Sequence, residues 1–152
     1  MLLRGGTRQY GPVPRHVFDL KPRWSDMDAY GHVNNVTWLD YLQEARVDMF
    51  RAFSSEPGGG MLAEGVVVAR LVIDYKAALV FRPEPVRIET WVSRATSASF
   101  TLDYEALDRA EGGASVRFVT AQTVLVPVTL ADGRPRRMRP GEQAVLERFA
   151  DN

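Results

Sequence analysis

Residues 23–46 read RWSDMDAYGHVNNVTWLDYLQEAR, a polar segment with one glycine that leads directly into an amphipathic pattern. From about residue 35 to residue 53, the apolar residues that recur at steps of three and four are Trp38, Leu42, Ala45, Met49 and Phe53. This spacing predicts a helix with one wide apolar side, which needs other structure packed around it. Asn34 or Asn35 is expected to supply the N-cap side chain.

The segments on both sides of this helix have the patterns of β-strands. Residues 16–20 alternate and predict a first strand, and residues 54–60 form a Gly-rich connector after the helix. The later segments rich in β-branched residues predict strands at 66–75, 86–92, 99–107 and 115–130. Residues 140–149 predict a short terminal helix with a proline in its first turn.

This order of elements predicts an α+β fold, in which a curled antiparallel sheet is wrapped around one long central helix. One helix cannot cover both faces of a sheet, and curling lets the sheet and the helix bury each other. The exposed sheet edges favour a homodimer or homotetramer. Residues 1–13 lack periodicity and are expected to be a flexible N-terminal tail, whereas residues 14–152 are expected to form one domain.

The composition excludes several classes of function. The 19 basic and 19 acidic residues balance, so the net charge gives no reason to expect nucleic acid as a partner. No apolar run reaches the roughly 18 residues that a membrane span requires. The chain contains no Cys and two His, which argues against disulfides, thiolate nucleophiles and a structural metal site. We therefore expect a cytoplasmic protein without a metal or other cofactor.

The string at residues 23–46 resembles the acyl-CoA thioesterases of the 4-hydroxybenzoyl-CoA thioesterase type, which belong to the hotdog superfamily. The similar features are the Asp-x-Asp-x-x-Gly turn, the string His-Val-Asn-Asn, and an aromatic-Leu-x-Tyr helix that continues to Glu-Ala-Arg. The resemblance extends over about residues 15–130. It implies the hotdog fold, an acyl-CoA substrate and hydrolysis of the thioester bond.

The resemblance also assigns a catalytic role to the second aspartate of the turn, which is Asp28 in this sequence. In the family this residue acts as a nucleophile or as a general base, and the residues themselves leave both mechanisms open. The positive end of the following helix would keep the Asp28 carboxylate ionised, and its N–H groups could stabilise the oxyanion. Gly31 would let the backbone approach the substrate carbonyl. His32 could orient a water or the substrate, or it could brace the loop.

Five further residues are candidates for binding the substrate. Tyr30, Asn34 and Asn35 lie close to Asp28 in the sequence, although both asparagines could serve only to cap the helix and to tie the loop to a strand. Ser97 and Ser99 lie in a turn between two predicted strands, and in a curled dimer this turn could reach a pocket at the subunit boundary. Asp26 is expected to bond the backbone of the turn.

Three other functions compete with acyl-CoA hydrolysis. A hotdog module could bind acyl-CoA without cleaving it. An acyl-ACP thioesterase is a second alternative, but Tyr30 occupies the position at which that branch carries an asparagine, which argues against its mechanism. A hotdog hydratase is the third, and the Asn-Pro dipeptide that such enzymes carry before the histidine is absent here.

Overall fold

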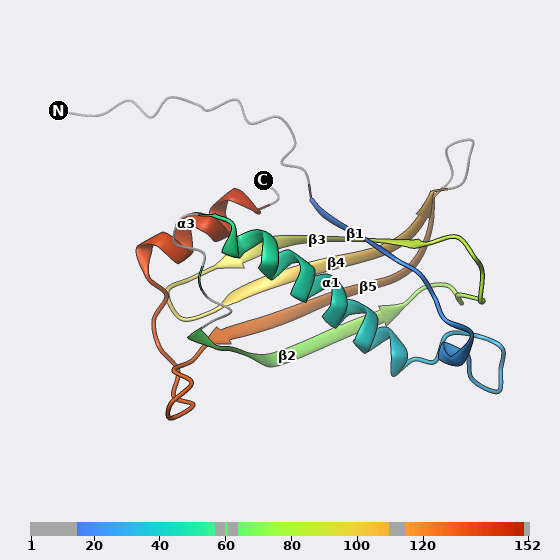
Figure 1. Ribbon diagram of the computed structural model, residues 1–152, viewed down its shortest axis with the longest axis horizontal. Coiled ribbons are helices and arrows are strands. Elements are labelled where there is room, and N and C mark those ends of the chain that lie inside the picture. Colours follow the sequence, from blue (N-terminus) through green and yellow to red (C-terminus); the bar gives the residue numbers. More distant parts are fainter. Residues whose placement is uncertain (1–14, 57–59, 61–63, 110–114, 151–152) are drawn as a thin grey trace.

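The computed structural model describes residues 15–56, 60, 64–109 and 115–150, so the predicted tail at 1–13 lies outside the described residues. Figure 1 labels the elements in these segments. The strands are β1 (His16–Leu20), β2 (Val66–Tyr75), β3 (Val86–Ala95), β4 (Phe100–Arg109) and β5 (Ser115–Pro127). The helices are the short 3-10 helix η1 (Trp24–Asp26), the long helix α1 (Thr37–Ser54) and the terminal helix α3 (Pro140–Arg148).

The five strands form one antiparallel sheet in the order β1-β3-β4-β5-β2, and α1 lies across one face of it (Figure 1). Side chains alternate along each strand, so every second residue of β4 faces the helix. The residues of β4 that are almost completely buried in this way are Phe100, Leu102, Tyr104 and Ala106. The apolar side of α1 is equally buried, from Trp38 to Phe53. These features confirm the predicted α+β arrangement of a sheet around one long helix.

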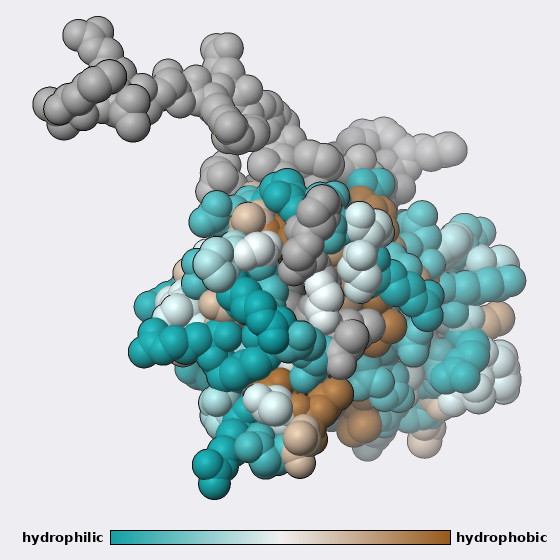
Figure 2. Space-filling view, turned by 60° about the vertical axis from the view of Figure 1, so that its left-hand side comes forward, coloured by the Kyte–Doolittle hydropathy of each residue, from teal (hydrophilic) through white to brown (hydrophobic). Residues whose placement is uncertain are grey.

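The residues singled out in the sequence lie at two opposite ends of the sheet. At one end β1 finishes at Leu20, which pairs with Val86 at the start of β3. The polar segment before α1 follows at this end, where the Val33 N–H donates to the Leu79 carbonyl over 2.8 Å. At the opposite end lies the turn between β3 and β4, with α3 beside it (Figure 1). Figure 2 brings this second end forward and shows mostly hydrophilic side chains with separate apolar patches.

The start of α1 differs from the prediction. The helix begins at Thr37 and its N-cap residue is Val36, so neither asparagine occupies the N-cap position. Asn34 still supports the helix start, because its Oδ1 accepts the Val36 N–H at 2.9 Å and its carbonyl accepts the Trp38 N–H at 3.3 Å. The side-chain hydrogen bond closes a turn in front of the helix instead of capping the helix itself.

No helix in the part of the chain that the structure describes is both long enough and apolar enough to cross a membrane.

Candidate functional site

Residues 26–34, here called the aspartate loop, fold back on themselves as a tight hairpin. Met27 and Val33 form an isolated antiparallel bridge, and the Asn34 N–H donates to the Asp26 carbonyl over 3.0 Å. Closer to the tip, the Asp28 N–H donates to the His32 carbonyl over 3.0 Å. The loop therefore has its own backbone hydrogen bonds, and Asp28 lies in the bonded part just before the tip.

Gly31 closes the tip of the aspartate loop. Its N–H donates to the Asp28 carbonyl over 3.0 Å, and its φ of 76° lies in the left-handed region that favours glycine. A Cβ at this position would meet no atom within 4 Å. Within this chain, glycine is therefore required here by the backbone conformation and not by a close neighbour.

The Asp28 carboxylate is half-buried and is held by two donors. Its Oδ1 accepts the Tyr30 N–H at 2.9 Å, and its Oδ2 accepts the Asn34 side-chain Nδ2 at 3.2 Å. Because Asn34 also bonds the residues at the start of α1, it links the carboxylate to the helix. Each carboxylate oxygen has a second lone pair, so both oxygens retain acceptor capacity after these two bonds.

The N-terminus of α1 leaves a backbone donor close to this network. The first N–H groups of a helix have no acceptor within the helix. Val36 and Trp38 donate to Asn34, and Leu39 donates to the Val36 carbonyl, but the Thr37 N–H has no hydrogen-bond partner among the described residues. The start of α1 thus offers the Thr37 N–H as an unpaired backbone donor, three residues after Asn34 in the sequence.

The other residues predicted near Asp28 lie around the same loop. Tyr30 and His32 are exposed at its tip, and His32 contributes its backbone carbonyl to the hairpin. Asn35 is exposed as well, and its carbonyl accepts the Tyr75 hydroxyl at 2.7 Å. This bond ties the segment before α1 to the end of β2, through the asparagine backbone instead of its side chain.

Ser97 and Ser99 are not brought to the aspartate loop within one chain. They lie in the turn between β3 and β4, at the opposite end of the sheet (Figure 1). The Ser97 hydroxyl accepts Arg137 Nη1 at 3.1 Å, and its carbonyl accepts the Met138 N–H at 2.8 Å. In one copy of the chain Ser97 therefore bonds the segment leading to α3, whereas Ser99 bonds Thr96 within the turn, where its carbonyl accepts the Thr96 N–H at 2.8 Å.

A buried polar pair that the sequence did not predict lies under the aspartate loop. The Tyr41 hydroxyl donates to the Asp26 carboxylate, and each residue is only 4% exposed. Burial opposes ionisation of Asp26, but the hydrogen bonds from Tyr41 and Arg23 outweigh it and hold the pKa of this carboxyl below its usual range. Burial and the bond to Asp26 raise the pKa of the Tyr41 hydroxyl. A buried tyrosine usually finds a hydrogen-bond partner, which is the one signal that could have pointed to this pair.

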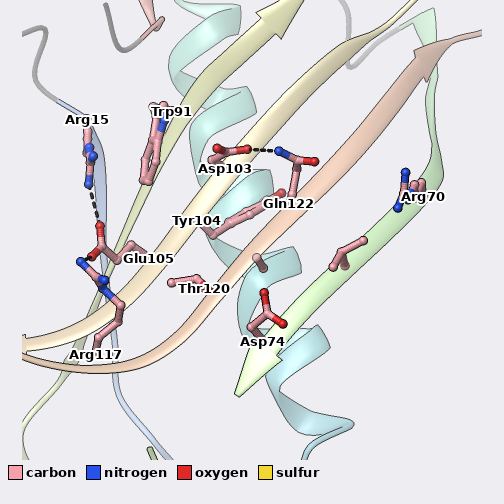
Figure 3. A pocket seen from close by; sticks show the side chains of 12 residues that line it. Arg15, Arg70, Asp74, Trp91, Asp103, Tyr104, Glu105, Arg117, Thr120 and Gln122 are labelled. Atoms are coloured by element: carbon pink, nitrogen blue, oxygen red, sulfur yellow. Dashed lines mark hydrogen bonds and ion pairs between the residues drawn. The ribbon is translucent and has the colours of Figure 1, made fainter. Parts of the chain in front are cut away.

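One hollow lies beside Asp26 and Tyr41, and another lies on the opposite face of the sheet. One of about 430 Å³ opens between the end of β1 and the first half of α1, and Asp26 and Tyr41 are among its lining residues. The other, of about 480 Å³, lies on the sheet face away from α1 and is drawn in Figure 3. Among its charged side chains, Arg15 and Arg117 both pair with Glu105, Arg15 at 2.7 Å, and none of the predicted site residues lines it.

Comparison with proteins of known structure supports the fold. The chain is 30% identical to the PA2801 protein of Pseudomonas aeruginosa, with a TM-score of 0.71 over 85% of this chain and 95% of that one. It is 15% identical to a variant of 4-hydroxybenzoyl CoA thioesterase complexed with 4-hydroxybenzoyl CoA, with a TM-score of 0.74 over 86% of this chain and 96% of that one. The second likeness concerns the fold alone. The predicted hotdog fold is thereby confirmed.

A curated relative and a family model complete the comparison. The YsmA protein of Bacillus subtilis, which is uncharacterised, is 35% identical over 86 residues, and this match spans 54% of each chain. The chain thus covers only about half the length of that relative. The model of the thioesterase-like superfamily matches residues 22–149, a range that contains the aspartate loop, α1, the four later strands and α3. This chain belongs to the thioesterase-like superfamily.

Proposed function

We propose that this protein hydrolyses acyl-CoA thioesters to the free acid and CoA, with Asp28 as the nucleophile or the general base. The observation that carries the proposal is the placement of the Asp28 carboxylate in a chain of the thioesterase-like superfamily. The carboxylate is held by Tyr30 and Asn34, with acceptor capacity left on both oxygens. The motif around it resembles the 4-hydroxybenzoyl-CoA type, and we extend the proposal to that type.

The chemistry needs only a carboxylate and donors for the developing oxyanion. As a nucleophile, an Asp28 oxygen attacks the thioester carbon, the C–S bond breaks, and the thiolate of CoA leaves and takes a proton from water. Water then hydrolyses the mixed anhydride and restores the carboxylate. As a general base, Asp28 takes a proton from the water that attacks the same carbon, the C–S bond then breaks, and the departing thiolate of CoA takes up that proton. In both mechanisms we assign oxyanion stabilisation to backbone N–H groups at the start of α1, such as that of Thr37.

The remaining residues of the aspartate loop have supporting roles in this proposal. Gly31 keeps the tip in the conformation that places Asp28, and His32 is proposed to orient the water or the substrate. Tyr30, Asn34 and Asn35 are proposed to contact the substrate as well as to shape the loop. For Asn34 the two roles are compatible, because its amide bonds the carboxylate that approaches the thioester.

We further propose that the functional unit is a homodimer or homotetramer built on the β2 edge. Val66 of β2 lies at the end of the sheet that carries the β3–β4 turn, and Tyr75 lies at the end that carries the aspartate loop. Antiparallel pairing of two β2 strands would therefore bring the partner's β3–β4 turn to the same end as Asp28. This geometry supports the substrate-binding roles predicted for Ser97 and Ser99, but only when they come from the partner subunit.

The direct test is release of free thiol from a panel of acyl-CoA substrates, with the matching acyl-carrier-protein substrates as a second arm. We expect turnover of at least one acyl-CoA and weaker turnover of its carrier-protein counterpart. Tight binding of acyl-CoA without thiol release would identify a binding module instead of an enzyme. Preferential cleavage of the carrier-protein substrates would identify an acyl-ACP thioesterase.

The absence of Cys and of a spanning helix in the described residues is compatible with the cytoplasmic location that we propose.

A further inference from the structure

The Asp26–Tyr41 pair is the most deeply buried polar contact that the proposed reaction leaves unused. Tyr41 lies on α1, and Asp26 ends η1 and begins the aspartate loop. The bond between them joins the loop directly to the central helix. Although both residues are among those that line the hollow of about 430 Å³, each is only 4% exposed, so little of either is available for contact with a substrate.

The Asp26 carboxylate is fully committed to structural partners. Besides the Tyr41 hydroxyl, its Oδ2 accepts the Arg23 N–H at 2.9 Å. Its Oδ1 accepts Nη2 and Nε of the Arg23 guanidinium at 2.9 Å and 3.2 Å. Asp28, two residues later, is half-buried, and its carboxylate has two donors among the described residues. The two aspartates therefore differ in accessibility: Asp28 can meet a substrate, whereas Asp26 is surrounded by its donors.

Two routes connect Asp26 to the position of Asp28. The first is the chain itself, because only Met27 separates the two aspartates, and Met27 is fixed by its bridge to Val33. The second runs through Asn34, whose N–H donates to the Asp26 carbonyl over 3.0 Å and whose Nδ2 donates to Asp28 Oδ2 over 3.2 Å. Any shift of Asp26 would therefore move both the backbone of Asp28 and the side chain that holds its carboxylate.

We propose that Asp26 and Tyr41 are positioning residues for thioester cleavage, which fix the aspartate loop on α1 and thereby set the place of the Asp28 carboxylate. This inference rests on the proposed role of Asp28. Neither residue touches the reacting atoms. Their contribution is to keep Asp28 and Asn34 in one arrangement, because displacing a catalytic group by about 1 Å can cost on the order of a hundredfold in rate.

The test compares Tyr41→Phe with Tyr104→Phe. Both substitutions remove one hydroxyl from a tyrosine that is almost completely buried, at 4% and 1% exposure. The Tyr104 hydroxyl bonds Arg46 at 3.3 Å and has no bond to the aspartate loop, so this variant is a control for the loss of a buried hydroxyl. We expect Tyr41→Phe to lower kcat by about tenfold or more, with KM changed less than twofold. Tyr104→Phe should leave kcat within about twofold of the unchanged protein.

Amide hydrogen exchange at Tyr30 and Asn34 gives a readout that does not depend on turnover. We expect faster exchange at both amides in Tyr41→Phe and unchanged exchange in Tyr104→Phe. Unchanged exchange in Tyr41→Phe, or an equal fall of kcat in the two variants, would overturn the positioning role. Full activity of Asp28→Asn would instead remove the proposed function, while the exchange data would still show whether Tyr41 holds the loop.

Discussion

At the scale of single residues, two aspartates that are close in sequence have opposite surroundings. Asp26 is buried among its donors, and its carboxyl has a lowered pKa. Asp28 is half-buried and keeps acceptor capacity on both oxygens. The motif predicted which aspartate is the catalytic candidate and gave Asp26 a bond to the turn backbone, which the structure confirms through the Arg23 N–H. The bond from Tyr41 could not be predicted, because helical spacing shows that a side chain is buried but not which loop lies over it.

A substitution at Gly31 tests whether the conformation of the loop tip matters for the reaction. Gly31 and Gly133 both have a positive φ, of 76° and 69°, and neither has an atom within 4 Å of an added Cβ. Replacing either with alanine should cost about 1–2 kcal/mol of stability, because an L-residue is strained in the left-handed region. Urea unfolding should show this loss in both variants. Thiol release should fall only in Gly31→Ala, and an equal change of activity in both would show that the tip conformation has no special role.

At the scale of elements, the periodicities predicted the strands and both α-helices, but several boundaries differ: β3 was predicted to end at 92 and ends at 95, and β5 was predicted to end at 130 and ends at 127. Strand β2 begins and ends where its β-branched run does, and α1 was predicted two residues too early, because Asn34 forms a turn before the helix instead of capping it. Strand β5 ends at Pro127, which pairs with the first residue of β2, Val66, and the next N–H, that of Val128, still donates to the Gly65 carbonyl over 3.0 Å. The spacing of apolar residues along the sequence does not show which strands pair, or which segments come to lie at the same end of the sheet. The sequence could therefore place Ser97 and Ser99 in a turn but could not show which end of the molecule holds it.

The β2 edge is the element on which the predicted homo-oligomer depends. Strand β2 pairs only with β5 among the described strands, and it exposes large apolar side chains: Val67 at 47%, Val68 at 46% and Val72 at 40%. A long apolar edge of this kind is a template for pairing with another chain. Light scattering should show a dimer or tetramer. In the double variant Val68→Lys with Val72→Lys, the equilibrium between oligomer and monomer should shift towards the monomer. A wild-type protein that stays monomeric at micromolar concentration would contradict the shared-edge proposal.

Lysine substitutions elsewhere provide the control for that experiment. Val116 on β5 is 45% exposed and pairs with Asp108 of β4, and it lies beyond the end of the β2–β5 pairing, which stops at Val119 opposite Tyr75. Val116→Lys adds the same kind of side chain to the same sheet and should leave the oligomeric state unchanged. If it dissociates the oligomer as well as the double variant does, the effect would come from added charge in general.

At the scale of the whole molecule, the fold places its candidate chemistry at one end of the sheet. The family model covers the aspartate loop and all the elements that hold it, from α1 to α3. The hollow in Figure 3 lies on the other face of the sheet, where charged side chains bond each other. An active site between the aspartate loop of one subunit and the β3–β4 turn of its partner is therefore the arrangement that we propose for the assembled protein.

The central claim is that the Asp28 carboxylate carries out the hydrolysis, and Asp28→Asn tests it most directly. The matched control is Asp132→Asn, because Asp132 Oδ1 accepts the Arg134 N–H at 3.0 Å, just as Asp28 Oδ1 accepts the Tyr30 N–H at 2.9 Å. Both substitutions keep an oxygen for this turn and remove one charge. In the thiol-release assay, we predict that Asp28→Asn lowers kcat by about 10²–10⁴-fold while Asp132→Asn leaves it unchanged. Turnover by a folded Asp28→Asn variant at the rate of the control would contradict the account.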